Sequence, residues 1–291
     1  MHRVEARELA YFVAVAEERH FGRAAARLGI AQPPLSRAIK QLEERMGVAL
    51  LLRTSRSVAL TPAGDVLLRE ARAALDAFDA AVRRAQRAAR EEPVLPVVMK
   101  PGGDGGLLSD ILAEYGTDPA AVPADVLVCR IGEQAGWLRD GRADVGFVQH
   151  PYDDLTGLDT EVLLTERQVA VLPCGHRLAR RATLTLGDLR DEPLPRWPGM
   201  APGSASGPEV RDTAQLLELI ALGRGVAILP ESMLSRLGED LVGIPVPEAP
   251  PTSVMVAWPD RSHSLAVAAF VRAATAVAAR REALARLGVP A

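Results

Sequence analysis

Two short helices joined by a tight turn, near the start of the chain, restrict the fold more than any other feature of this sequence. The first is predicted over 23–28 and ends at Gly29, because glycine adopts the left-handed conformation of a helix C-terminus without strain. The second opens with Gln32-Pro33-Pro34, where prolines in the first turn sacrifice no internal hydrogen bond, and it ends at Gly47. Two helices around a turn that contains glycine form a helix-turn-helix arrangement, whose second helix enters the major groove of DNA.

The second of these helices has one apolar and one polar face. Its inward side chains are Leu35, Ile39, Leu42 and Met46, and its outward side chains are Ser36, Arg37, Lys40, Gln41 and Arg45. Arginine, lysine, glutamine and serine have hydrogen-bonding partners on base edges and phosphates. A three-helix structural bundle with a hydrated polar face would give the same pattern, so the pattern alone leaves both interpretations open.

The flanking segments complete a small helical unit with a wing. Apolar residues at helical spacing predict a first helix over about 5–18. After the second helix of the motif, 49–52 and 57–60 flank Arg53-Thr54-Ser55-Arg56, which favours a β-hairpin with basic side chains at its tip.

Charge is distributed unevenly along the chain. Residues 1–92 carry 16 basic and 12 acidic side chains, whereas the whole chain has a net charge of −3. A locally basic N-terminal module on a mildly acidic body favours a polyanionic partner at one end only.

These residues resemble the DNA-binding motif of LysR-type transcriptional regulators. The resemblance rests on the stretch Phe21–Lys40 and continues through Leu42-Glu43, Gly47, Leu50, Arg53-Thr54, Arg56 and Leu60–Gly64. It is close over about 5–65 and looser through the rest. The DNA-binding residues that it implies are Arg23, Gln32, Pro33, Pro34, Ser36, Arg37, Lys40, Arg53 and Arg56. We expect Gln32, Ser36, Arg37 and Lys40 to face the major groove, and Arg53 and Arg56 to bind phosphates.

One position departs from this motif. Ala31 stands where the family often has Ser or Thr, the side chain that caps the following helix. We therefore expect a loss of about 1 kcal/mol of helix stability and of one hydroxyl available to a phosphate.

A long apolar stripe follows the winged unit. Its members recur every three or four residues and are Leu67, Leu68, Ala71, Leu75, Phe78, Val82 and Ala85. A coiled-coil partner is the simplest way to bury so narrow and long a stripe, although packing on the chain's own C-terminal body is an alternative. The resemblance favours a dimer-forming linker helix and implies a homodimer that assembles into a homotetramer.

From Val94 onward, short apolar strands alternate with helices. The strands are expected over 94–99, 126–129, 145–148, 169–172 and 226–229, and the helices over 107–115, 135–139, 212–222, 231–237 and 265–287. This order predicts an α/β body with largely parallel strands. Val169–Ala179 and Leu219–Glu231 resemble the LysR-family effector domain, which is similar to periplasmic solute-binding proteins and has two α/β subdomains around a cleft.

The expected organisation is therefore α/β overall with an all-α winged helix-turn-helix at the N-terminus. The domains are 1–61 for DNA binding, 62–92 for the linker helix and 93–291 for effector binding. Within the last domain, the first subdomain takes about 93–160 and 260–291, and the second takes about 161–259.

A ligand is expected in the cleft between these subdomains. In the family, the turn after the first strand of the effector domain commonly touches the ligand; here it runs from Lys100 to Gly106. Lys100 is a cation for an anionic effector, and Asp104 either caps the next helix or pairs with Lys100. The expected effector-binding residues are Lys100, Gly102, Gly103, Asp104, Gln149, His150, Trp197 and Met200. For Trp197, as for Trp258, packing in the core is the alternative role.

Other classes of protein are disfavoured by what the sequence contains. Cys129 and Cys174 cannot build a disulfide framework, and the N-terminal residues do not read as a signal peptide, so we expect a cytoplasmic protein without a membrane span. Cys174, His176 and His150 lack the spacing of a zinc site, and nucleotide-binding or hydrolase motifs are not recognised in a suitable context, so no metal, cofactor or catalytic residue is expected.

The function that we infer is that of a LysR-type regulator whose operator binding responds to a small molecule, and not that of an enzyme. The alternative is an enzyme or ligand carrier with the solute-binding fold and a structural helical N-terminal segment. A DNA-binding protein with a silent cleft also remains open.

Overall fold

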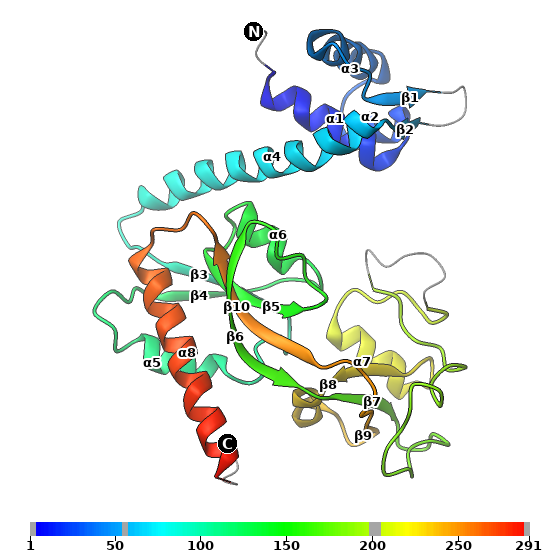
Figure 1. Cartoon of the computed structure of the whole chain (residues 1–291), viewed down its shortest axis with the longest axis vertical. Helices are drawn as coiled ribbons and strands as arrows, with labels where there is room; N and C mark the ends of the chain where they lie inside the picture. Colours follow the sequence, from blue (N-terminus) through cyan, green and yellow to red (C-terminus); the bar gives the residue numbers. More distant parts are fainter. Residues whose placement is uncertain (1–3, 54–57, 198–204, 288–291) are drawn as a thin grey trace. The chain divides into compact units, whose positions relative to one another are not determined.

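The chain forms two compact units, residues 1–86 and 87–291. The structure, a computed structural model, describes residues 4–53, 58–197 and 205–287 (Figure 1). Within the described residues, no helix is long and apolar enough to cross a membrane.

The first unit is a winged helix-turn-helix with a long C-terminal helix. Its elements are α1 (Ala6–Glu18), α2 (Phe21–Leu28), α3 (Gln32–Met46), β1 (Leu51–Arg53), β2 (Val58–Leu60) and α4 (Pro62–Ala88). Gly29 and Gly47 have positive φ values of 66° and 70° and end α2 and α3, as the sequence predicted. The fully buried Phe12 of α1, Ala24 of α2 and Leu35 of α3 lie together in one core.

The first turn of α3 shows that the predicted loss of helix stability at Ala31 is wrong. Ala31 is the residue that precedes the helix, and its side chain makes no capping bond, as predicted. A capping side chain accepts a hydrogen bond from the second or third helical N–H, but Pro33 and Pro34 occupy these positions and have no N–H. The expected loss of about 1 kcal/mol therefore does not apply, because the amide groups that a cap would satisfy are absent.

Two polar side chains hold the wing against the helices. The Glu43 carboxylate of α3 accepts hydrogen bonds from the backbone N–H groups of Leu50 and Leu51, at 2.9 and 3.0 Å. The Thr61 hydroxyl accepts a bond from the Gly64 N–H and donates one to the Ala49 carbonyl oxygen, which joins the wing to the first turn of α4.

The second unit contains two sheets. Its elements are β3 (Leu95–Met99), α5 (Leu108–Tyr115), β4 (Ala124–Val128), α6 (Gln134–Arg139), β5 (Val145–His150), β6 (Leu158–Glu166), β7 (Gln168–Pro173), α7 (Thr213–Ala221), β8 (Ala227–Pro230), the 3-10 helix η1 (Glu231–Arg236), β9 (Leu241–Pro245), β10 (Thr252–Pro259) and α8 (Leu265–Arg286). The first sheet has the order β4-β3-β5-β10-β6, and the second has the order β8-β7-β9.

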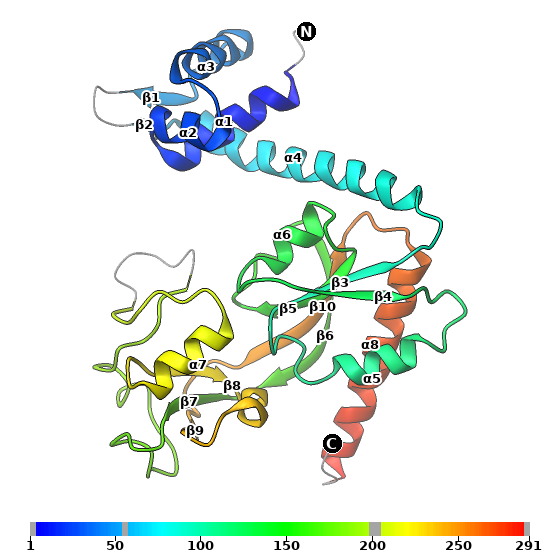
Figure 2. The same cartoon turned by 180° about the vertical axis from the view of Figure 1, so that it is seen from behind.

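Alternate residues of β3 face different cores of the first sheet. Val97 lies in the core that α5 and α8 cover, together with Phe147 and Phe270, whereas Val98 lies in the core that α6 covers (Figure 2). The first lobe is therefore a sheet between two helical layers.

The expectation of largely parallel strands is wrong. Among the described strands of this unit, β3–β4 and β3–β5 are parallel pairs, whereas β10 is antiparallel to β5 and β6, and β7 is antiparallel to β8 and β9. The sequence interpretation omitted β6, β9 and β10, and it expected an α-helix where η1 forms.

The positions of β6 and β10 also make the boundary between the lobes differ from the expected one. Because β6 and β10 belong to the first sheet, the first lobe extends to Glu166 and resumes at Thr252, and the second lobe lies between them. The two connecting segments meet where the Gln168 amide donates a 2.7 Å hydrogen bond to the Thr252 hydroxyl, both side chains being buried.

Candidate DNA-binding face and ligand cavity

The outer face of α3 presents most of the predicted DNA-binding residues together. Gln32, Pro33, Pro34, Arg37 and Lys40 are exposed, and Ser36 is half-buried. On the opposite face, the three residues that pack in the core are Leu35, Ile39 and Leu42. The predicted amphipathic division of α3 is therefore present over Leu35 to Leu42, but the prediction that Met46 faces inward is wrong, because its side chain is 37% exposed at the end of the helix.

Arg37 and Lys40 differ in their surroundings. Arg37 forms no hydrogen bond or ion pair with any part of the chain that the structure describes. The Lys40 ammonium lies 3.6 Å from the Glu44 carboxylate, one turn further along α3, and both side chains are largely exposed. Such an exposed pair contributes little stability and can exchange its carboxylate for a phosphate.

Arg45 does not face outward as expected. Its guanidinium forms an ion pair with the Glu8 carboxylate of α1, and only 29% of its side chain is exposed. The contact joins α1 to α3, so Arg45 stabilises the unit and does not belong to the outer face.

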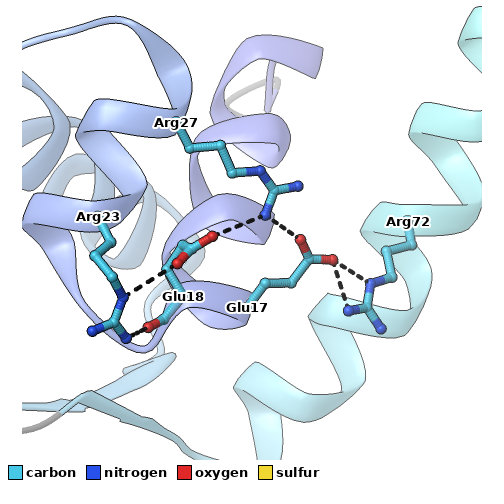
Figure 3. A network of polar contacts seen from close by, with 5 residues as sticks. All are labelled: Glu17, Glu18, Arg23, Arg27 and Arg72. Carbon is cyan, nitrogen blue, oxygen red and sulfur yellow. Dashed lines mark hydrogen bonds and ion pairs between the residues drawn. The ribbon is translucent and has the colours of Figure 1, made fainter. Parts of the chain in front are cut away.

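Arg23 is held by the end of α1. Its guanidinium lies 3.3 Å from the Glu18 carboxylate and also donates a hydrogen bond to the Glu18 carbonyl oxygen (Figure 3). Glu18 is the last residue of α1, and cations favour this end of a helix because unpaired carbonyl groups accumulate there. Arg23 thus orients α2 against α1.

Glu17 connects three helices through two arginines. One of its carboxylate oxygens accepts a 2.6 Å bond from Arg27 of α2, and the other accepts bonds of 2.9 and 2.7 Å from Arg72 of α4 (Figure 3). Burial raises the pKa of Glu17, but the hydrogen bonds from both arginines outweigh it and hold the pKa below its usual value. The carboxylate is therefore ionised at neutral pH and links α4 to the helix-turn-helix.

The two arginines predicted for the wing lie at the edge of the described residues or beyond it. Arg53 ends β1, and its side chain lies outside the described side chains, whereas Arg56 lies outside the described residues. Their predicted phosphate contacts therefore stay predictions.

The second unit has a cavity of about 440 Å³ between its two lobes. The first lobe contributes Lys100, Pro101, Gly102, Ile131, Gly132, Ala135, Arg139, Gln149, Tyr152, Asp153 and Asp154; the second contributes Trp197, Thr213, Leu216, Ile228, Leu229, Pro230 and Met233. This volume suits a small organic molecule, and most of the lining is apolar with a few polar groups, as is usual for such sites.

Lys100 and Asp153 dominate the electrostatics of the first-lobe wall. Burial lowers the pKa of Lys100, although the nearby Asp153 carboxylate opposes this shift. Burial raises the pKa of Asp153, against the effects of the Gln149 N–H and Lys100. The Asp153 carboxylate accepts a 2.7 Å bond from the Gln149 N–H and a 3.4 Å bond from the Gln134 amide.

Three polar contacts cross between the lobes near this cavity. The Thr213 hydroxyl, in the first turn of α7, donates a 3.3 Å bond to the Pro101 carbonyl oxygen. The Ser232 N–H of η1 donates a 3.0 Å bond to the Glu166 carboxylate, and the Arg236 guanidinium lies 3.7 Å from the Asp104 carboxylate. The structure thus has the two lobes in polar contact.

Four of the eight predicted effector residues line the cavity: Lys100, Gly102, Gln149 and Trp197. Trp197 also packs against the core of the second lobe. Trp258 packs against the core of the first lobe and is not among the described residues that line the cavity.

The others have different positions. Asp104 is buried and accepts a 3.2 Å bond from the Leu108 N–H, the first N–H of α5, although Leu107 is the N-cap residue. Its ion-pair partner is Arg236 and not Lys100. Gly103 does not line the cavity. His150 is exposed and also absent from the lining, because successive side chains of β5 point to opposite sides and Gln149 takes the inward position. Met200 lies outside the described residues.

Sequence reasoning missed several residues of this cavity, among them Tyr152, Asp153 and Thr213. A signal for Thr213 existed, since the helix predicted over 212–222 starts with Asp212, a residue type that favours the N-cap; Asp212 caps α7 by accepting a bond from the Gln215 N–H. Nothing in the sequence places that helix end opposite Lys100.

The cysteines and histidines have ordinary surroundings. Cys129 is buried, which raises the pKa of its thiol to about 12, and the Cys174 thiol donates to the Glu239 carbonyl oxygen. The His176 ring lies 3.4 Å from the Glu192 carboxylate. Among the described residues, no group of three or more histidine, cysteine or acidic side chains is arranged to hold a metal ion.

Comparisons with known proteins cover both units. Residues 6–65 match the family described as "Bacterial regulatory helix-turn-helix protein, lysR family", and residues 88–279 match the "LysR substrate binding domain". The HTH-type transcriptional regulator AlsR of Bacillus subtilis (strain 168) is 36% identical over 248 residues, which cover 79% of this chain and 81% of that protein.

Two solved structures extend this similarity. Full-length BenM is 28% identical with a TM-score of 0.51 and covers 99% of both chains. Full-length CbnR, complexed with its target DNA, is 26% identical with a TM-score of 0.51 over 94% of this chain and 100% of that chain. The similarity therefore includes the helix-turn-helix, α4 and the two-lobed unit.

Proposed function

The chain belongs to the LysR family of DNA-binding transcriptional regulators, and from this we propose which of its residues bind DNA and which bind the effector. We assign base contacts to Gln32, Arg37 and Lys40 on α3. The observation that carries this assignment is the exposed Arg37, whose guanidinium has no partner among the described residues and lies on a face opposite the core. An unpaired arginine on such a helix is suited to bidentate contact with guanine.

The remaining predicted residues take supporting roles in this proposal. Ser36, which is half-buried, and the wing residues Arg53 and Arg56 contact phosphates. Pro33 and Pro34 shape the first turn of α3. Arg23 orients α2 through Glu18 and contributes to DNA binding indirectly.

Footprinting tests this assignment on the DNA upstream of the chain's own gene. Arg37→Ala should weaken specific binding by about 1–3 kcal/mol and relax specificity at one base pair. Arg190→Ala is the matched control, because Arg190 is an exposed arginine of the second unit with no described side-chain partner. If Arg37→Ala and Lys40→Ala both leave operator affinity at the wild-type value, the assignment of α3 to the groove is wrong.

We also propose that α4 forms a homodimer and that two dimers form a homotetramer. Phe78 and Val82 lie one turn apart on α4 and are 57% and 42% exposed, which is unusual for large apolar side chains on a charged helix. A second copy of the helix buries such a stripe.

Charged substitutions in the stripe test the dimer. In the double variant Leu75→Glu with Phe78→Glu, pairing would bury carboxylates without partners, and sedimentation should show monomers. Ala73→Glu, an exposed position on the other side of α4, is the control and should leave the assembly unchanged. An unchanged oligomer in the double variant would contradict burial of this stripe between two copies of α4.

The effector site in this proposal is the cavity between the lobes, with Lys100, Gly102, Gln149 and Trp197 as contacts. Its support is that both lobes line one largely apolar space, at whose wall the half-buried Lys100 ammonium and Asp153 carboxylate lie. Binding there would change the operator affinity by favouring one arrangement of the lobes. We also propose a cytoplasmic location, because a regulator of this kind acts on chromosomal DNA.

A further inference from the structure

Lys100 is a cation without an anionic partner in direct contact among the described residues. It follows β3 at the cavity wall and is half-buried, and its ammonium group forms no hydrogen bond and no ion pair with any residue within the described ranges. Removing a charged group from water without a partner is unfavourable. A ligand that supplies a negative charge at this point would therefore gain more from the contact than it would at the protein surface.

The other charged groups of the wall are already engaged. The Arg139 guanidinium donates to the carbonyl oxygens of Asp154 and Thr156, at 3.0 and 3.2 Å, and lies 3.6 Å from the Asp154 carboxylate. The Asp153 carboxylate accepts bonds from the Gln149 N–H and the Gln134 amide. Of the two cations that line the cavity, Lys100 is thus the one available to a ligand.

The second lobe adds a positive helix end and an apolar surface. Thr213 lines the cavity and begins α7, so the partial positive charge of this nine-residue helix lies at the same space. The apolar surface comes from both lobes and includes Ile131, Ala135, Trp197, Leu216, Ile228 and Met233. A ligand that fills the cavity must therefore be apolar over most of its surface.

The wall also limits the ligand's charge. The carboxylates of Asp153 and Asp154 lie beside the cavity, so a second negative charge on the ligand would meet repulsion without a second available cation. Cys129, which also interacts electrostatically with Lys100, stays a neutral thiol because its pKa is about 12.

We propose that this cavity selects an organic monocarboxylate with an apolar body. The carboxylate binds the Lys100 ammonium near the first turn of α7, and the body packs against Trp197, Ile228 and Met233. This inference rests on the proposed effector function of the cavity and adds the chemical class of the effector.

Calorimetric titration of the full chain tests this class with matched probes. Hexanoate and phenylacetate are compared with their primary amides, and adipate, norleucine and hexylamine represent a dianion, a zwitterion and a cation. At least one monocarboxylate should bind the wild type about tenfold or more tightly than its amide. Lys100→Met should weaken that carboxylate about 10- to 100-fold and remove its advantage over the amide, as loss of a charged hydrogen bond predicts. Arg190→Met removes a positive charge elsewhere in the unit and should change neither affinity.

A second measurement needs no variant. A bound carboxylate stabilises the charged form of Lys100, whose pKa burial has lowered, so binding should take up protons at alkaline pH. Its affinity should fall as the pH rises and Lys100 loses its charge. Titrations in buffers with different ionisation enthalpies measure this uptake directly.

Three results would overturn the proposal: failure of every carboxylate to bind at millimolar concentration, equal affinity for acid and amide, or tighter binding of the dianion, zwitterion or cation. Operator binding, followed by fluorescence anisotropy of labelled DNA, separates this inference from the proposed function. If an amide binds best and changes operator affinity, the cavity is regulatory and the class is wrong. If a carboxylate binds through Lys100 without changing operator affinity, the class stands and the regulatory function of the cavity fails.

Discussion

The first turn of α3 allows a specific test of how a proline pair changes helix capping. Ser at position 31 normally stabilises a helix by about 1 kcal/mol relative to Ala, because its hydroxyl accepts the second or third N–H of the helix. In this chain both positions are proline, so Ala31→Ser should change the stability of α3 by less than about 0.3 kcal/mol. Pro34→Ala restores one N–H. In that background, Ala31→Ser should stabilise the first turn by about 1 kcal/mol.

Hydrogen exchange resolved by peptide measures this difference within the full chain. Relative to Pro34→Ala alone, the double variant should show about fivefold slower exchange at the start of α3, since 1.4 kcal/mol corresponds to a factor of ten. Peptides from the second unit provide the internal reference. Equal effects of Ala31→Ser in the two backgrounds would refute the reasoning, because the cycle isolates the interaction between the hydroxyl and the restored N–H.

Two further perturbations test the packing of each unit. Glu17→Gln should destabilise the first unit by about 1 kcal/mol at neutral pH, a modest value because Arg27 and Arg72 are half exposed. The pKa of Glu17 is lowered in the folded state, so its contribution to stability is present above the ordinary value of 4.5 and disappears as the pH falls through the folded pKa. Hydrogen exchange of the α1 and α2 amides should therefore show the wild type and the variant becoming equally stable at that pH. A stability difference that persists in acid would contradict the ionic cause. Gly146→Ala should destabilise the second unit by roughly 2–4 kcal/mol, because the added methyl group would overlap the Val98 side chain and carbonyl oxygen. Thermal unfolding measures it against Gly175→Ala, where nothing lies within 4 Å of the added atom, and equal melting temperatures for the two would refute the steric argument.

The first unit was largely predictable because its determinants are local. Gly29 and Gly47 end the two helices of the motif, and the stripe of α3 follows one helical period. The role of Arg45 was mistaken because its partner Glu8 lies 37 residues earlier in the chain. Sequence spacing on one helix does not report such a contact.

The second unit depends more on contacts between distant segments. The buried strands β3, β5 and β7 are short apolar runs that were recognised, whereas β6 mixes polar and apolar residues. Its paired residues in β10 lie 86 (Glu166–Thr252) to 101 (Leu158–Pro259) positions later. Missing β6 and β10 gave a wrong strand direction and a wrong lobe boundary.

The cavity was also only partly predictable, because its lining comes from segments that are distant in the sequence. Lys100 was identified from its position after a strand, but Thr213 and Met233 reach the cavity only because the second lobe folds back opposite the first. Both Gln149 and His150 were predicted to line the cavity, but only Gln149 does, because one residue along a strand reverses the face.

Selection of DNA from a random library by the full chain tests the central claim most directly, because it requires no knowledge of the natural operator. The wild type should enrich a sequence with two related half-sites, and Arg37→Ala should enrich the same arrangement with one base pair per half-site no longer specified. Recovery of an identical motif by Arg37→Ala, or of no motif by the wild type, would contradict the account of α3 as the element that reads operator DNA.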